Sequence, residues 1–107
     1  MAEITIDAGD SRDIPFTTKD IDGVLTDADA LKVHVTNAQK VKTVDTYGEP
    51  DSKITKNSTG DYTFRLSVPY DNDSIGEWYM AIQCLDSDGN SLEVEPLNIN
   101  VPNIGTL

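Results

Sequence analysis

The chain has 107 residues, of which 8 are Lys or Arg and 19 are Asp or Glu, so its formal net charge is −11 at pH 7. This length suits one domain, and the acidic balance argues against nucleic acid and anionic membranes, because both are bound through Lys and Arg. The charge either keeps a small β protein from aggregating or matches a basic partner surface. We expect a single domain over residues 1–107, with an ordered core at about 3–101 and a short tail at 102–107.

Short strands separated by turns are predicted in the first part of the chain. Residues 4–6 alternate between apolar and polar side chains and end at a turn over 7–10. Residues 12–18 alternate again, and Pro15 among them indicates an edge strand. Asp20–Gly23 has the composition of a turn.

The middle of the chain contains one clear strand and two weaker ones. Residues 31–36 alternate so that Leu, Val and Val point to one face, which is typical of a half-buried strand. Residues 26–31, immediately before and into it, could form one helical turn. Residues 40–46 are predicted as a weaker strand that ends at the turn 47–50, and Ile54 marks another short strand.

The clearest strands are 62–68 and 78–84, where the even positions are apolar. Asp88-Gly89 is a strong hairpin signal that leads into a return strand. The apolar positions of this return strand change from even (Leu92) to odd at Pro96. A one-residue slip turns every side chain to the other face, so we predict a bulge at Pro96 that absorbs the change.

About seven to nine short strands at this spacing predict an all-β fold, an immunoglobulin-like antiparallel β-sandwich. The absence of sustained helical periodicity agrees with this class. The residues predicted to form its core are Phe16, Leu31, Val33, Val35, Tyr62, Phe64, Leu66, Trp78, Met80, Ile82, Leu92 and Ile99.

Residue types that could carry catalysis are few. His34 is the only histidine and falls on the polar face of its strand, whereas Cys84, the only cysteine, falls on the apolar face. One Cys and one His supply neither a disulfide nor a tetrahedral zinc site. The 19 acidic residues leave paired carboxylates for glycoside cleavage open, but no cleft-lining aromatic set accompanies them, and Trp78 lies on a core face. We expect no enzyme activity, no catalytic residue and no cofactor.

Two acidic turns have oxygen atoms at the spacing of calcium ligands. They are Asp71–Asp73 and Asp86–Asn90. A calcium site needs roughly six to eight oxygen ligands, and Ile75 stands where an EF-hand loop would need one. Asp, Asn and Gly are also the ordinary residues of hairpin turns. We therefore expect no metal site, with calcium at either turn as the alternative.

The N-terminus indicates where the chain is made. Residues 1–4 carry neither the basic region nor the apolar run of a signal peptide. No stretch approaches the roughly 20 apolar residues that cross a bilayer. We expect synthesis in a reducing cytoplasm and later action elsewhere, for example in a particle that is released by lysis.

Two stretches carry a family resemblance. The first is Gly9–Val35, and the second joins Ser58–Leu66, Ile75–Ile82 and Asp86–Asn90. Together they resemble the small immunoglobulin-like domains of tailed-bacteriophage virions, which show an Asp-Gly turn after an early strand, then a Gly-x-Tyr strand and a Gly-x-Trp/Tyr strand. The resemblance covers most of the chain, but the segment Ala38–Lys56 has no family pattern.

The resemblance implies a structural role without chemistry. Members of that family are capsid decoration proteins, neck or tail-tube additions and baseplate attachment domains, and no catalytic residues belong to the family. It implies a virion protein that binds the major capsid protein, or another virion structural protein, non-covalently on the outside of the shell. A tail, neck or baseplate accessory domain is one alternative, and a carbohydrate-binding or adhesive surface module is another. A homo-oligomer on the particle, such as a trimer, is compatible with each.

Partner contacts are expected in the N-terminal segment Ala2–Asp10 and at the turns. Chain ends and edge strands are the parts of a sandwich that are free to pair with another surface. Ile4 and Ile6 lie on a short alternating strand that either closes the domain's own sheet or adds to a neighbour's. Asp7 and Asp10 complete the set of candidate contact residues. The net charge favours a basic patch on the partner, so part of the binding should weaken with salt.

Overall fold

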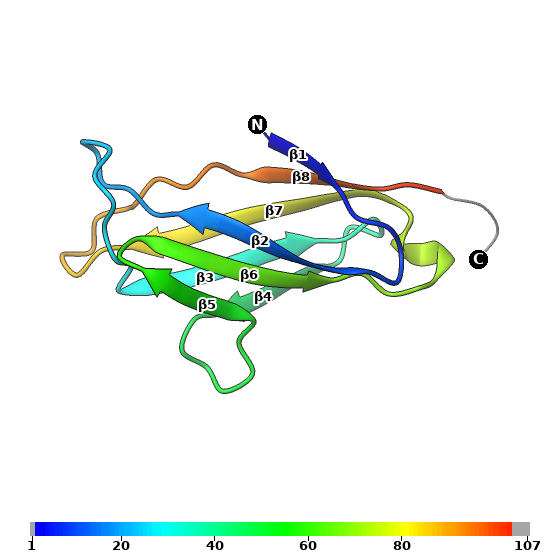
Figure 1. Ribbon diagram of the computed structural model, residues 1–107, viewed down its shortest axis with the longest axis horizontal. Helices are drawn as coiled ribbons and strands as arrows, with labels where there is room; N and C mark the ends of the chain where they lie inside the picture. The colour runs from blue at the N-terminus through cyan, green and yellow to red at the C-terminus, as the bar shows by residue number, and fades with distance from the viewer. Residues whose placement is uncertain (1, 104–107) are drawn as a thin grey trace.

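The computed structural model describes residues 2–103, which form two β-sheets and one short 3₁₀ helix (Figure 1). The first sheet has the strand order β1-β8-β7-β3-β4 and the second has the order β2-β6-β5. The predicted all-β class is confirmed. Within these residues no helix has the length and apolarity needed to cross a bilayer. The elements are β1 (Ala2–Thr5), β2 (Ser11–Thr17), β3 (Ala30–Thr36), β4 (Lys42–Thr46), β5 (Ile54–Ser58), β6 (Asp61–Ser67), η1 (Asn72–Ser74), β7 (Gly76–Leu85) and β8 (Leu97–Val101). Of the predicted tail, residues 104–107 lie outside the described part of the chain.

One strand pair departs from the antiparallel arrangement that the sequence predicts. β1 runs parallel to β8, with Ile4 opposite Ile99, whereas the other strand pairs are antiparallel. The reason lies in the connection that follows β1. It leads from the first sheet to the second, so β1 and β8 need no tight hairpin between them and can run in the same direction.

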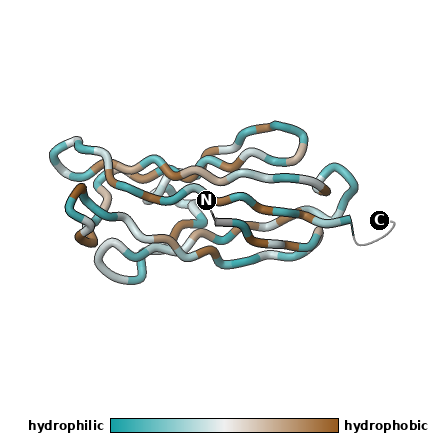
Figure 2. Tube along the Cα trace, turned by 90° about the horizontal axis from the view of Figure 1, so that it is seen from above, coloured by the Kyte–Doolittle hydropathy of each residue, from teal (hydrophilic) through white to brown (hydrophobic). Residues whose placement is uncertain are grey.

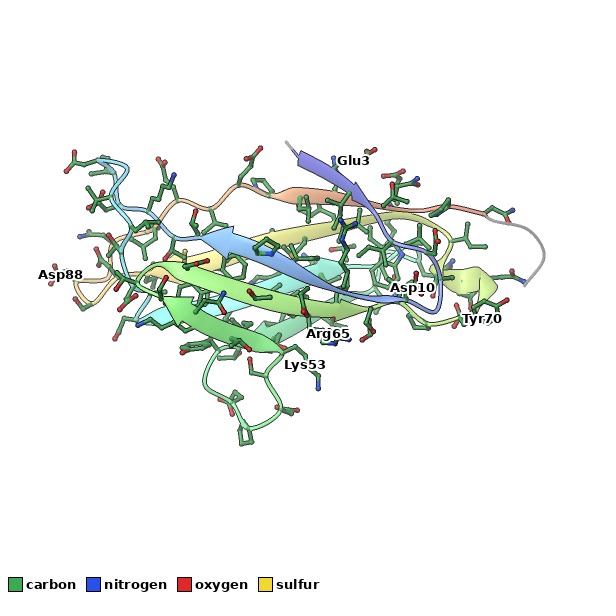
Figure 3. All side chains as sticks on the ribbon, in the orientation of Figure 1. Glu3, Asp10, Lys53, Arg65, Tyr70 and Asp88 are labelled. Atoms are coloured by element: carbon green, nitrogen blue, oxygen red, sulfur yellow. The ribbon has the colours of Figure 1, made fainter. Side chains whose placement is uncertain are left out.

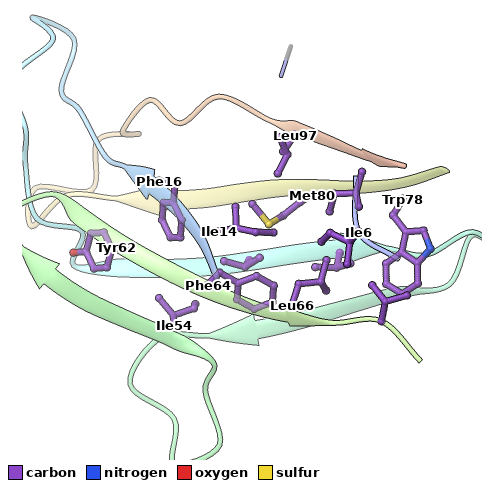
Figure 4. Close-up of a cluster of buried hydrophobic side chains, with 14 of the residues drawn as sticks. Ile6, Ile14, Phe16, Ile54, Tyr62, Phe64, Leu66, Trp78, Met80 and Leu97 are labelled. Carbon is purple, nitrogen blue, oxygen red and sulfur yellow. The ribbon is translucent and has the colours of Figure 1, made fainter. Parts of the chain in front are cut away.

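The two sheets enclose the core because their strands alternate between apolar and polar residues (Figure 2). Tyr62 is 1% exposed, and its ring stacks on Phe16 with ring centres 5.6 Å apart, toward one end of the cluster in Figure 4. Each predicted core residue is buried except Ile82, which is partly buried against the core. Ile82 is less covered because residues 93–96, which precede β8, do not pair with β7 beside it.

That segment contains the predicted irregularity near Pro96. Ser91 pairs with Leu85, and Leu97 pairs with Met80. From Ser91 to Leu97 the chain advances six residues, whereas the paired stretch of β7 from Leu85 to Met80 covers five. One extra residue therefore lies between Ser91 and Leu97, as a bulge requires. Between these points Glu93 pairs with Lys19 rather than with β7. The register change is confirmed, and the strand is interrupted rather than continuous.

Residues 26–31 do not form the helical turn that their sequence allows. The Thr26 N–H donates to the Thr18 carbonyl oxygen, and the Ala28 N–H donates to the Tyr62 hydroxyl at 3.1 Å. The Asp29 N–H donates to the Leu85 carbonyl oxygen at 2.8 Å. Because these N–H groups bind acceptors outside the segment, they are not available for the hydrogen bonds that would close a helical turn.

The edge predicted at Pro15 is confirmed, since β2 is the outer strand of the second sheet. The Thr18 N–H donates to the Gly60 carbonyl oxygen at 2.9 Å. Backbone hydrogen bonds to β6 therefore come from the even-numbered residues of β2. The odd-numbered Pro15 therefore turns its nitrogen, which carries no hydrogen, toward the open edge. Such a residue weakens pairing with another chain at that point.

The segment 38–56, which lacks the family pattern, contains one of the crossings between the sheets. A loop over residues 47–53 leads from β4 in the first sheet to β5 in the second. Asp45 closes this loop, because its carboxylate accepts from the Ser52 hydroxyl at 2.6 Å and from the Lys53 N–H at 2.8 Å. Lys53 is labelled beside the loop in Figure 3.

Candidate interaction surface

The structure separates the four predicted contact residues into a buried and an exposed group. Ile6 is 3% exposed and belongs to the core, and its N–H donates to the Asn100 carbonyl oxygen at 3.1 Å. Ile4 is half-buried on β1 and packs against the core. Asp7 and Asp10 are exposed at one turn, where the Asp10 N–H donates to the Asp7 carbonyl oxygen. β1 thus adds to the domain's own sheet, and in this conformation Ile6 has almost no surface to offer a partner.

A groove runs beside β1, between the first sheet and the open edge of β2. Its volume is about 370 Å³, and Ile4, Ile14, Phe16 and Leu97 contribute to its lining. Ile4 therefore remains available at the rim of an apolar depression. The N-terminal surface that the structure leaves to a partner consists of Ile4, Asp7 and Asp10, at or near the protein surface.

A second candidate surface lies at the end of the molecule that Asp88 marks in Figure 3, opposite the end marked by Tyr70 and Asp10. It carries Ile21, which is 90% exposed, together with Val24 at 59% and Leu25 at 45%. We call this surface the loop end and define it as residues 18–29 and 86–93. Sequence reasoning treated Asp20–Gly23 only as a turn. The available signal was an apolar residue between two Asp residues of a turn, where polar residues are common.

The hairpin that bears Ile21 is firmly attached at its base. Thr18 is fully buried, its hydroxyl donates to the Thr26 carbonyl oxygen, and its N–H donates to the Gly60 carbonyl oxygen. Asp27 accepts from the Gly60 N–H at 2.9 Å and from Lys56 Nζ at 2.7 Å. The ammonium group of Lys56 and the Gly60 N–H together lower the pKa of Asp27. The hairpin therefore extends from a bonded framework rather than from a loose loop.

Three turns of the chain share one hydrogen-bond pattern: Asp20–Val24, Asn37–Val41 and Asp86–Asn90. In each, the side-chain Oδ1 of the first residue accepts from the N–H groups of the third and fifth residues at 2.9–3.0 Å. The carbonyl oxygen of the first residue accepts from the fourth residue's N–H, and its own N–H donates to the fifth residue's carbonyl oxygen. The first and third turns lie at the loop end, and the second joins β3 to β4 at the opposite end.

Local hydrogen bonds occupy one carboxylate oxygen in each of the two acidic turns that resemble calcium loops. Asp86 Oδ1 already accepts two backbone N–H groups, and Asp71 Oδ1 accepts from the N–H and the hydroxyl of Ser74 at 2.9 Å each. Their positions are those of turn and helix-cap residues. Across residues 2–103, no group of three or more His, Cys, Asp or Glu side chains is arranged to hold a metal ion.

His34 and Cys84 point to opposite faces of the first sheet. His34 lies opposite Ala81 on the outer face, and its Nε2 is 3.2 Å from Gln83 Oε1. Cys84 lies opposite Leu31 on the core face and is 3% exposed. Burial raises the pKa of the Cys84 thiol. The sheet separates the two groups, so they cannot act together as a nucleophile and its base.

A scan against protein-family models finds no match, and no curated protein sequence matches the chain significantly.

Proposed function

We propose that this chain is an immunoglobulin-like domain that serves as a structural protein of a tailed-bacteriophage virion. In this role it attaches non-covalently to the outer face of the capsid shell, where its partner is the major capsid protein or another virion structural protein. It is a decoration protein, and this role requires neither catalysis nor a cofactor.

The order of the strands supports the immunoglobulin-like part of the proposal. β2-β6-β5 corresponds to the B-E-D sheet of that fold, and β3-β7-β8 corresponds to its C-F-G sheet, with β4 extending the latter on one side. Two hallmarks of antibody domains differ in this chain. Trp78 lies on β7, the counterpart of strand F rather than C, and Cys84 has no second cysteine with which to form the inter-sheet disulfide. The likeness is therefore to the architecture and not to antibody domains themselves.

The observation that carries the proposal is where the family-like motifs fall on the strands. Gly60 and Gly76 immediately precede or begin β6 and β7, both have positive φ (65° and 134°), and each is followed two residues later by a buried aromatic. These aromatics are Tyr62 and Trp78. The motifs thus occupy the strand starts that the resemblance requires, and the Asp-Gly turns fall between strands.

Two properties favour attachment without a covalent bond. The thiol of Cys84 lies in the core, where its Sγ is 3.5 Å from the Leu92 carbonyl oxygen. The net charge of −11 favours association with a basic surface, and such association is steered by electrostatics. Binding to the particle should therefore weaken as the salt concentration rises.

The proposal is tested on the particle of the virus that encodes the chain. We expect quantitative mass spectrometry to find it in purified virions in hundreds of copies, and cryo-electron microscopy to place a density of this size on the shell. A few copies at the neck, tail or baseplate would replace decoration by an accessory role there. Absence from the virion would overturn the proposal.

One observation favours a second candidate, a carbohydrate-binding or adhesive module. Tyr79 is 37% exposed on the outer face of the first sheet, and Tyr70 is 66% exposed at the end opposite the loop end. Aromatic rings are the side chains on which sugars stack. A glycan array distinguishes the two functions: reproducible binding that Tyr79→Ala or Tyr70→Ala abolishes would favour the module, and no binding would favour the virion role.

A further inference from the structure

The three turns with the shared hydrogen-bond pattern allow a comparison within one molecule. The second residue of the turn is Ile21 in the first, Ala38 in the second and Ser87 in the third. The fifth residue is Val24, Val41 and Asn90, respectively. The Asp86–Asn90 turn forms the same hydrogen bonds with polar residues at its second and fifth positions. The backbone of this kind of turn therefore requires no apolar side chain at either of these positions. The apolar residues of the Asp20–Val24 turn therefore have no role in shaping the turn.

These residues also contribute little to the core. Ile21 is 90% exposed and Val24 is 59% exposed, so burial within the domain does not account for them. Leu25, the next residue along the chain, is 45% exposed and pairs with Lys19, which also pairs with Glu93. Exposed apolar residues gathered on one feature are typical of contact surfaces. The hydrogen bonds of Thr18 at the base of the hairpin reduce the entropic cost of ordering these residues when a partner binds.

The charge around Ile21, Val24 and Leu25 is strongly negative. Residues 18–29 and 86–93 contain seven acidic residues and one lysine, a net charge of −6 out of −11 for the whole chain. The corresponding turn at the opposite end carries Lys40 and no acidic residue. The loop end therefore joins an apolar protrusion to an acidic border, a combination that suits an apolar depression bordered by Lys and Arg.

We propose that the loop end is a docking surface, in which Ile21, Val24 and Leu25 enter an apolar depression of a basic protein surface. The acidic residues of the border, Asp22 and Asp88 among them, face the Lys and Arg residues of the partner. The inference rests on the proposed function in one respect: it takes the partner to be a protein of the virion shell. It adds a contact surface distinct from the N-terminal residues Ile4, Asp7 and Asp10.

The test uses virions prepared without this protein and measures how purified protein rebinds to them. Val24→Ser is compared with Val41→Ser, because both valines are the fifth residue of the same kind of turn and are 59% and 55% exposed. We expect Val24→Ser to weaken binding about tenfold and Val41→Ser to leave it within about twofold, because only the first removes apolar contact area. Both variants should melt like the parent, since neither valine is buried.

A charge pair gives an independent measurement. Asp22→Asn should weaken binding and reduce its salt dependence, whereas Asp51→Asn, in the exposed loop of residues 47–53, should change neither. Binding that Val24→Ser and Asp22→Asn leave unchanged would overturn the docking surface and leave the proposed function intact. Failure of the parent protein itself to bind the particle would overturn both.

Discussion

Lys40 holds the left-handed backbone conformation that Gly23 holds at the same position of another turn. The φ angle is 66° at Lys40 and 81° at Gly23. In this region the Cβ atom crowds the backbone, and a residue other than glycine is strained. The side chain of Asn37 keeps the turn closed, because its Oδ1 accepts from the N–H groups of Gln39 and Val41. The chain thus holds a strained residue where its two other turns of this kind have glycine.

Lys40→Gly should stabilise the domain by about 0.5–1 kcal/mol, because removal of the strain exceeds the added entropy of glycine in the unfolded chain. Urea denaturation of the variant and the parent measures the difference. Lys40→Ala is the control, since it removes the same charge and keeps the strain, and it should be close to the parent. Equal stabilisation by both variants would show that charge rather than backbone conformation is responsible.

Gly60→Ala should be strongly destabilising, by more than about 2 kcal/mol. A Cβ atom at Gly60 would lie 2.9 Å from the Thr18 carbonyl oxygen and 2.9 Å from the Thr26 nitrogen, and φ is +65°. Gly89→Ala is the matched control, because φ there is +82° but nothing lies within 4 Å of the added atom. It should cost only the backbone strain, about 1 kcal/mol. Thermal or chemical unfolding of the two variants separates contact from strain, and equal losses would contradict the close packing at Gly60.

Trp78→Ala should cost roughly 3–5 kcal/mol in unfolding free energy, because it empties a large buried volume. Trp78 is 7% exposed, and its Nε1 donates to the Ser74 carbonyl oxygen at 2.8 Å, which ties β7 to η1. Trp78→Phe keeps an aromatic ring and loses this hydrogen bond, so its cost should be smaller. A Trp78→Ala protein as stable as the parent would mean that the ring is not part of the core.

Stability should depend on acid pH through Asp27. Its hydrogen bonds from Lys56 and from the Gly60 N–H lower its pKa below the ordinary 3.8. A pKa that is lower in the folded than in the unfolded chain stabilises the fold above the unfolded value, and this stabilisation is lost as the pH falls through the folded value. Asp27→Asn should therefore melt below the parent near neutral pH, and the difference should shrink below about pH 3.8. A difference independent of pH would contradict this.

Calcium should have no effect on stability, because Oδ1 of Asp71 and Oδ1 of Asp86 already accept turn hydrogen bonds and no group of three or more acidic side chains within residues 2–103 is arranged to hold an ion. Melting curves recorded with millimolar calcium and with a chelator should superimpose. A rise of several degrees with calcium would reveal a site at one of the two turns. Asp86→Ala or Asp71→Ala would then identify which.

The interaction surfaces were only partly accessible to sequence reasoning. Ile4 and Ile6 look equivalent in an alternating segment, but the parallel pairing of β1 with β8 leaves one half-buried and the other in the core. Ile21 lies in a segment that reads as an ordinary turn. Its significance depends on exposure and on comparison with the Ser87 turn, and both require the folded backbone.

The local part of the structure can be predicted from the order of the residues alone. Alternation of apolar residues indicated most of the strands and more than half of the buried apolar residues, since inward and outward positions follow from the period of two. Asp-Gly pairs marked two of the three related turns, and the change of parity at Pro96 indicated the extra residue. These features depend only on neighbours along the chain.

The tertiary structure decided what distant residues do to one another. It placed β1 beside β8, and it joined the N–H groups of Ala28 and Asp29 to Tyr62 and Leu85, which lie far away along the chain. It also gathered residues 18–29 and 86–93 at one end. Pairing between distant strands depends on how both sheets close over a shared core, and no local pattern contains that information.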